Sequence, residues 1–138
     1  MLTTYIIDGE AVAKGRPRFT RRGHTYTPKK TADYEKHIKQ QLIEQGAEPF
    51  TKETPLRVEA TFYKGYLKSW TKAELFQVKD GSLLPVKRPD LDNYVKGILD
   101  GANGLLWHDD SQIVDLILYK RYDETPRVEI KVSEIKFI

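Results

Sequence analysis

Five aspartates lie in a single stretch, residues 87–110, which reads KRPDLDNYVKGILDGANGLLWHDD. Asp90 and Asp92 form a D-x-D pair, and Lys96 follows one helical turn after Asp92. Carboxylate oxygens are hard ligands that suit Mg²⁺, and two or three are enough because the ion keeps several waters. A lysine beside them would neutralise charge that develops on a phosphate. This combination is typical of metal-dependent hydrolysis of a phosphodiester.

Helix capping is the simpler explanation of the same D-x-D pair. Aspartate commonly caps a helix or occupies its first turn, and Pro89 suits a helix start. A surface ion pair between Asp92 and Lys96 would contribute only about 0.2–0.5 kcal/mol. The pair lies off the apolar face of the predicted helix, however, so we expect both side chains to point away from the core. That face has residues at helical spacing: Leu91, Val95, Ile98, Leu99 and Ala102.

A second acidic pair, Asp109 and Asp110, follows a glycine-containing turn and precedes an apolar segment. A helix, a short turn and a strand can fold back on one another, so this pair is a candidate source of a third metal ligand. Spacing alone does not place it beside the first pair. Asp100 lies about 12 Å along the helix axis from Asp92, too far to bind the same metal, so we expect it to have a structural or supporting role. His108 stands alone in a turn, where a histidine is more often exposed than bound to a metal.

The most basic segment of the chain, residues 14–30, holds seven cations and no acid, although the whole chain has a net charge of only +3. Lysine and arginine neutralise phosphates and release counterions, which gives salt-dependent binding to nucleic acid. Phe19 and Tyr26 are interleaved with these cations, and such aromatic rings can stack on unpaired bases. Gly23 among polar and β-prone residues indicates a hairpin or an exposed loop. A solvated loop is the alternative, but we predict a segment that binds nucleic acid, with contacts from Lys14, Arg16, Arg18, Arg21, Arg22, Lys29 and Lys30.

Periodicity along the chain predicts a compact, single α/β (α+β) domain over residues 1–138, with a mixed sheet and about three helices. The helices are expected after an N-cap at Thr31, after a Thr71–Glu74 capping box, and from about Asp90. Strands are expected at residues 5–12, 56–62, 113–119 and 128–132. Because residues 113–119 are nearly all apolar, we predict a central strand that is buried on both faces. The Thr125–Pro126 turn predicts that this strand and the last one form a hairpin.

Composition excludes several classes of protein. The chain has no cysteine, which excludes disulfides and cysteine-based zinc sites. Charged residues make up 31% of the chain, and no apolar run approaches the length of about 18 residues that a membrane helix needs. Acids also stand near the N-terminus, where a signal peptide would be apolar. We therefore expect a cytoplasmic protein with no membrane segment and no small-molecule cofactor, and the basic segment favours its association with the nucleoid.

Two segments resemble the RusA family of Holliday junction resolvases. Residues 88–114, RPDLDNYVKGILDGANGLLWHDDSQIV, are similar to the family's D-x-D-N-x-x-K motif, which is followed by an aspartate, a tryptophan and D-D-x-Q. Residues 14–35, KGRPRFTRRGHTYTPKKTADYE, resemble the family's basic N-terminal segment. The two matches occur in order and at compatible spacing. Tyr94 stands where the family commonly has leucine, which is a mild departure.

The resemblance implies a RusA-like, homodimeric endodeoxyribonuclease that resolves four-way (Holliday) DNA junctions in recombination and repair by paired symmetric nicks. It also implies that Asp90, Asp92 and Asp110 bind Mg²⁺, which activates the attacking water, with Asp109 as the rival for the third position. Lys96 would then stabilise the phosphate in the transition state. We expect Mn²⁺ to substitute for Mg²⁺. Because small resolvases of this family are often encoded by phages, the resemblance favours a phage or prophage origin.

Two other functions are compatible with the residues. One is a nuclease that acts on flaps or forks, and the other is a non-catalytic module that binds DNA junctions and whose acids only cap a helix. Cleavage rates on junction, fork, flap and linear duplex, with and without Mg²⁺, would distinguish the three functions.

Overall fold

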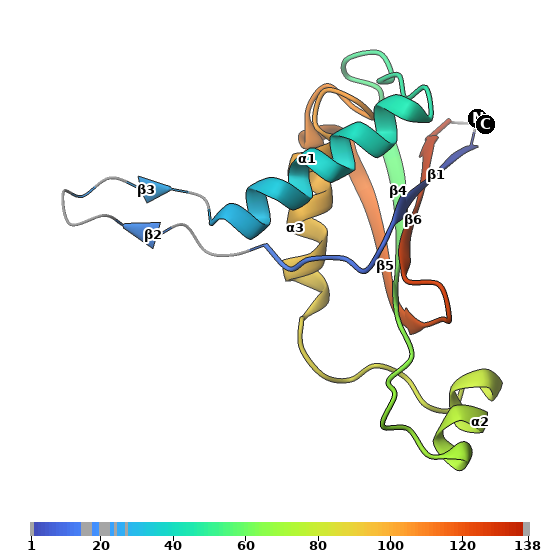
Figure 1. Cartoon of the computed structure of the whole chain (residues 1–138). Helices are drawn as coiled ribbons and strands as arrows, with labels where there is room; N and C mark the ends of the chain where they lie inside the picture. Colours follow the sequence, from blue (N-terminus) through green and yellow to red (C-terminus); the bar gives the residue numbers. More distant parts are fainter. Residues whose placement is uncertain (1, 15–17, 20–22, 24, 27, 137–138) are drawn as a thin grey trace.

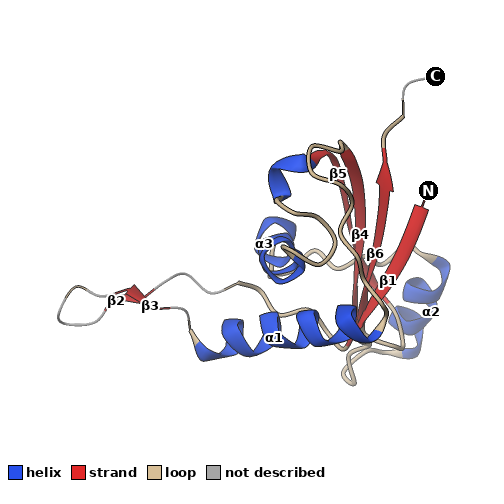
Figure 2. Ribbon diagram, turned by 90° about the horizontal axis from the view of Figure 1, so that it is seen from above, coloured by secondary structure: helices blue, strands red, loops and turns tan. Residues whose placement is uncertain are grey.

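The fold is built around a mixed four-stranded sheet with two helices on one face (Figure 1, Figure 2). The computed structural model describes residues 2–14, 18–19, 23, 25–26 and 28–136. The strands follow the order β1–β6–β4–β5, with bounds β1 Leu2–Asp8, β4 Leu56–Lys64, β5 Ile113–Tyr122 and β6 Arg127–Glu134. The helices are α1 (Lys29–Glu44), α2 (Lys72–Asp80) and α3 (Leu91–Ala102). A mixed sheet with three helices confirms the predicted fold class.

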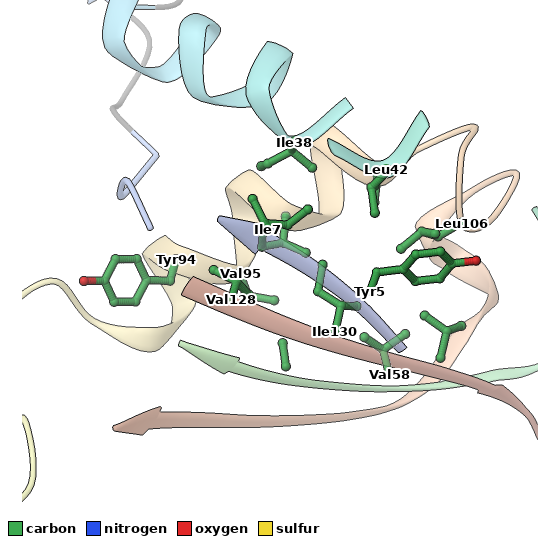
Figure 3. Close-up of a cluster of buried hydrophobic side chains, with 14 of the residues drawn as sticks. Tyr5, Ile7, Ile38, Leu42, Val58, Tyr94, Val95, Leu106, Val128 and Ile130 are labelled. Carbon is green, nitrogen blue, oxygen red and sulfur yellow. The ribbon is translucent and has the colours of Figure 1, made fainter. Parts of the chain in front are cut away.

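The apolar core lies between the sheet and helices α1 and α3. Alternate residues of β4 are buried and face these helices: Leu56, Val58, Ala60 and Phe62. Figure 3 shows side chains of both helices and of the sheet meeting in this layer, among them Ile38, Leu42, Val95, Ile7 and Ile130. Burial of each such side chain contributes about 1.5–3 kcal/mol. The apolar stripe predicted for residues 91–102 therefore packs where the sequence predicts it.

Helix α3 is fixed against both the sheet and α1. A Cβ atom at Gly101 would lie 2.9 Å from Cγ2 of Ile38, so only glycine allows α1 and α3 to approach this closely. The ring of Tyr94 stacks on Phe62 of β4 with 5.1 Å between ring centroids. These contacts determine where the acids at the two ends of α3 lie.

Strand β5 is an edge strand, which corrects the prediction of a central strand buried on both faces. Within the described part of the chain it pairs with β4 alone, in parallel, and Val114 and Leu116 are 61% and 42% exposed. A short apolar run does not by itself distinguish a buried strand from an edge, because both patterns look the same along the sequence. The one acid of this run, Asp115, pairs with Arg57 of β4 at 2.9 Å.

The predicted hairpin between the last two strands is also wrong. Strand β6 pairs antiparallel with β1 and with β4, so β4 lies between β5 and β6. The turn at Thr125–Pro126 exists, but it carries the chain past the end of β4. The local sequence cannot reveal this because the inserted strand comes from residues more than 50 positions earlier.

Helix boundaries agree with the sequence at α2 and α3 and differ at α1. Thr71 and Glu74 form the predicted capping box, and Gly81 ends α2 with a φ of 85°. Helix α1 begins at Lys29, so Thr31 is a buried residue of its first turn and not the N-cap. Strand β1 ends at Asp8, earlier than predicted. No helix among the described residues is long and apolar enough to cross a membrane.

Candidate active site

Asp90 and Asp92 lie exposed at the N-terminal end of α3, as predicted. Asp90 is the N-cap residue, but its side chain makes no capping hydrogen bond. Among the described residues, neither acid forms a salt bridge, and the exposed Lys96 is not paired with Asp92. Two carboxylates that neither cap nor pair are available to bind a cation, which weighs against capping as their only role.

The backbone that leads into α3 is held by the end of β5. Nζ of Lys120 donates hydrogen bonds to the carbonyl oxygens of Lys87 and Pro89, at 2.9 and 3.1 Å. Asp90 follows directly and borders a hollow of about 370 Å³ that is also lined by Asn93. The segment that leads directly into Asp90 is therefore held by a residue near the end of β5, which is not evident from the sequence.

The second acidic pair lies in a turn that is organised by Gln112. Its Oε1 accepts hydrogen bonds from the backbone N–H groups of His108 and Asp109, at 2.8 and 3.2 Å. Its Nε2 donates to the carbonyl oxygens of Thr51 and Thr54, both at 3.1 Å. Gln112 is only 9% exposed, so it ties the acidic turn to the loop before β4. We did not predict this role, although the glutamine of the D-D-x-Q motif was a signal for it.

The pKa values of the two acids in this turn are shifted in opposite directions. The hydroxyl of Ser111 donates to Oδ2 of Asp109 at 2.7 Å, and this bond lowers the pKa of the Asp109 carboxyl. Burial raises the pKa of Asp110, and the nearby charges of Asp109 and Asp100 raise it further. A bound cation would offset that unfavourable environment. This difference favours Asp110 over Asp109 as the acid that gains most from a metal.

Within one chain, the structure does not bring Asp110 together with Asp90 and Asp92. Helix α3 has 12 residues and is therefore about 18 Å long. The buried Trp107 donates from Nε1 to Oδ1 of Asn103 at 2.9 Å, which places the acidic turn near the C-terminal end of α3. No group of three acids or histidines that could hold a metal exists among the residues that the structure describes.

Lys14, one of the predicted DNA contacts, has partners inside the chain. Its ammonium pairs with the carboxylate of Asp100, and Glu35 of α1 lies 3.5 Å away. Its backbone N–H donates to the carbonyl oxygen of Asn93 at 3.1 Å. Lys14 therefore attaches the start of the basic segment to α3 through Asp100.

Of the remaining predicted DNA contacts, those that the structure describes lie on or after a small hairpin: Arg18, Lys29 and Lys30. Strands β2 (Arg18–Phe19) and β3 (Thr25–Tyr26) pair antiparallel, which confirms a hairpin in the basic segment. Figure 1 shows this hairpin projecting from the body of the molecule. Lys29 and Lys30 are exposed in the first turn of α1. Three predicted contacts lie outside the described residues: Arg16, Arg21 and Arg22.

A family model described as Endodeoxyribonuclease RusA matches residues 8–133 of the chain. The chain belongs to the RusA family. It is therefore an endodeoxyribonuclease, a phosphodiester hydrolase, as the resemblance in its motifs implied. The match spans the hairpin, the D-x-D pair and the D-D-x-Q turn, so all the candidate residues lie within the RusA domain.

Two relatives cover nearly the whole RusA domain. A Bacillus subtilis (strain 168) protein with the name Uncharacterized protein YqaN is 36% identical over 137 residues, which cover 95% of each chain. The crossover junction endodeoxyribonuclease rusA of Lactococcus phage r1t is 34% identical over 137 residues, 98% of this chain and 92% of the phage protein. The similarity is therefore not confined to the motifs.

Proposed function

We propose that this endodeoxyribonuclease resolves four-way DNA junctions as a Mg²⁺-dependent homodimer. The observation that carries the proposal is the pair of exposed carboxylates of Asp90 and Asp92, which neither cap α3 nor form salt bridges among the described residues. The name of the phage relative supports the choice of a crossover junction as substrate. The same relative supports a phage or prophage origin.

The donor set fits a hard divalent cation, because Asp90 and Asp92 offer carboxylate oxygens that face water. When bound, Mg²⁺ would activate a water and polarise a phosphoryl oxygen, and Mn²⁺ would do the same. Lys96 would donate to a non-bridging oxygen as negative charge builds on the phosphate. The bond from the water oxygen to phosphorus forms as the bond from phosphorus to the leaving deoxyribose oxygen breaks.

A homodimer formed through β5 would complete the ligand set. β5 has an open edge, with the exposed apolar residues Val114 and Leu116, and such an edge is a template for pairing with another strand. Two copies of β5 paired antiparallel would bring the start of one strand opposite the end of the other. Asp110 lies just before β5, and Asp90 lies beside its end, where Lys120 holds Pro89. Asp110 of one copy would then join Asp90 and Asp92 of the second.

A two-fold dimer also matches the substrate. Two identical sites related by a two-fold axis would face two equivalent strands of a four-way junction. Paired nicks in those strands would release two duplexes that can be ligated. The basic hairpin of each copy would contact the phosphates of an arm, which predicts strongly salt-dependent binding.

The test compares cleavage of a four-way junction, a fork, a flap and a linear duplex in Mg²⁺, Mn²⁺ and EDTA. We expect paired nicks in the junction with either metal and none in EDTA. Faster cleavage of flaps or forks than of four-way junctions would show that flaps or forks are the preferred substrates. Tight binding without strand breaks in either metal would instead support a non-catalytic module.

A further inference from the structure

Residues 65–88, between β4 and α3, form a separate lobe that contains α2 and that we call the α2 lobe (Figure 1). Its first part is attached to the sheet through Trp70, whose ring meets Tyr122 of β5 edge-on with 4.7 Å between centroids. Its last part is held by Lys64 of β4, whose Nζ donates to the carbonyl oxygen of Arg88 at 3.4 Å. Asp90 follows two residues later, so the lobe is fixed directly beside the acids.

The α2 lobe presents positive charge to solvent. It has five cations, Lys68, Lys72, Lys79, Lys87 and Arg88, and two acids, Glu74 and Asp80. Both acids accept hydrogen bonds from the lobe's own backbone, Glu74 from the N–H of Thr71 at 3.1 Å and Asp80 from the N–H of Ser82 at 2.8 Å. All five cations are exposed, and none forms a salt bridge within the described residues.

An aromatic ring lies between two of these cations on the surface of α2. Phe76 is 68% exposed, although burial of such a ring would favour folding. Lys72 stands four residues before it and Lys79 three residues after it, so all three side chains lie on one face of the helix. Cations around an exposed aromatic ring match the chemistry of DNA, since phosphates bind the cations and a base stacks on the ring.

The α2 lobe and the β2–β3 hairpin lie on opposite sides of the molecule. Figure 1 and Figure 2, which differ by a 90° turn, both place α3 between them. A DNA strand cut at the N-terminal end of α3 would therefore pass the hairpin on one side of the cut and the lobe on the other. The positive charge of the α2 lobe favours DNA as its partner over an apolar protein surface.

We propose that the α2 lobe is a second DNA-binding surface, in which Lys72 and Lys79 bind phosphates and Phe76 stacks on an unstacked base near the cut. This inference rests on the proposed function for the position of the cut. DNA binding by the lobe itself does not require that the bound substrate be a four-way junction.

Fluorescence anisotropy of a labelled four-way junction in EDTA, at several salt concentrations, measures this binding without cleavage. Lys72→Gln with Lys79→Gln should weaken binding and lower the slope of log affinity against log salt by about two. Phe76→Ala should weaken junction binding about tenfold with the slope unchanged, and Phe76→Trp should retain it. The matched control is Lys131→Gln with Lys136→Gln, which removes the same charge from exposed positions on the sheet and beyond its far end.

Cleavage in Mg²⁺, measured on the same proteins, separates the two proposals. If the lobe variants bind DNA like the control pair, the lobe inference is wrong, whether or not junctions are cut. If the lobe variants bind weakly but the wild-type protein cuts no junction, the lobe inference holds and the proposed function fails. A change in oligomeric state with unchanged DNA affinity would identify the lobe as a protein interface and overturn the inference. Absence of DNA binding by the wild-type protein would overturn both proposals.

Discussion

The two ends of α3 carry the same residue type in opposite surroundings. At the N-terminal end, Asp90 and Asp92 are exposed and have no salt bridge among the described residues. At the C-terminal end, Asp100 is paired with Lys14, which attaches the basic segment to the helix. An aspartate that already neutralises a lysine has less to gain from a metal than an unpaired one. This contrast supports our proposal that the first end is catalytic, whereas Asp100 attaches the basic segment to α3.

Asp110 departs from this division, because it lies near the C-terminal end and yet forms no salt bridge among the described residues. Burial raises the pKa of the Asp110 carboxyl, and the charges of Asp109 and Asp100 raise it further, so a bound cation would stabilise its ionised form. The burial and the charged neighbours of each aspartate therefore distinguish these acids better than their positions in the sequence motif do. In our proposal, Asp110 would bind the metal ion that Asp90 and Asp92 of a second copy of the chain also bind.

The largest expected effect is that of Asp92→Asn, which removes a proposed metal ligand from the unpaired end. Loss of several kcal/mol of transition-state stabilisation corresponds to a fall of about 10³-fold or more in the cleavage rate. Junction binding should persist, because the basic segment is untouched. Single-turnover cleavage and anisotropy check both results. Glu48→Gln, at an exposed position in the loop between α1 and β4, serves as the control. Unchanged cleavage by Asp92→Asn would contradict a catalytic role for the N-terminal end of α3.

Mixing two inactive variants tests whether Asp110 of one copy and Asp92 of the other form one site across a dimer. Asp110→Asn should be inactive by itself, as should Asp92→Asn. If the two proteins are mixed and allowed to exchange subunits, each mixed dimer contains one intact composite site, so roughly a quarter of the wild-type number of sites returns. Such a dimer should nick one strand without resolving the junction. A mixture with no activity, although subunit exchange is demonstrated, would place the complete site within one chain.

Gln112→Ala has a smaller effect because it acts on the shape of the acidic turn. The change removes the bonds to the His108 and Asp109 N–H groups and leaves the Thr51 and Thr54 carbonyls unsatisfied. We expect the free energy of unfolding to fall by about 2–3 kcal/mol. Cleavage should fall about 10–100-fold below the unfolding temperature. Gln40→Ala is the matched control, since that exposed amide bonds only Glu44 among the described residues. Equal stability of the two variants would contradict the positioning role.

The sequence predicts the elements well where the signal is local. The capping box of α2 and the stripe of α3 involve residues within a few turns of one another, and both are confirmed. The predictions for β5 and for the last hairpin failed because strand order depends on β4, which lies far away in the sequence. An apolar run such as Ile113–Tyr122 is equally compatible with a buried central strand and with an edge strand that pairs with another chain.

The same limit applies to the site. The D-x-D pair was predicted at a helix start because proline, aspartate and helical spacing are all local signals. The sequence does not predict the distance between Asp92 and Asp110, because this distance depends on the direction of α3 relative to β5. The pairing of Lys14 with Asp100 joins residues 86 positions apart, and no spacing rule predicts it.

The smallest expected effect is that of Asp100→Asn, which tests whether the paired end is only structural. The hydrogen bond from Lys14 to Asp100 raises the pKa of the lysine above its usual 10.5. The pair therefore stabilises the fold below that pH, and its contribution is lost as pH rises through the raised pKa. Because both groups are partly exposed, Asp100→Asn should lower the free energy of unfolding at neutral pH by at most about 1 kcal/mol. Urea unfolding at about pH 7 and pH 11, in a cycle with Lys14→Met, should show a larger difference at the lower pH, and none at either pH when Lys14 is absent. Cleavage should change by less than about threefold, so inactivity of folded Asp100→Asn would assign chemistry to both ends of α3.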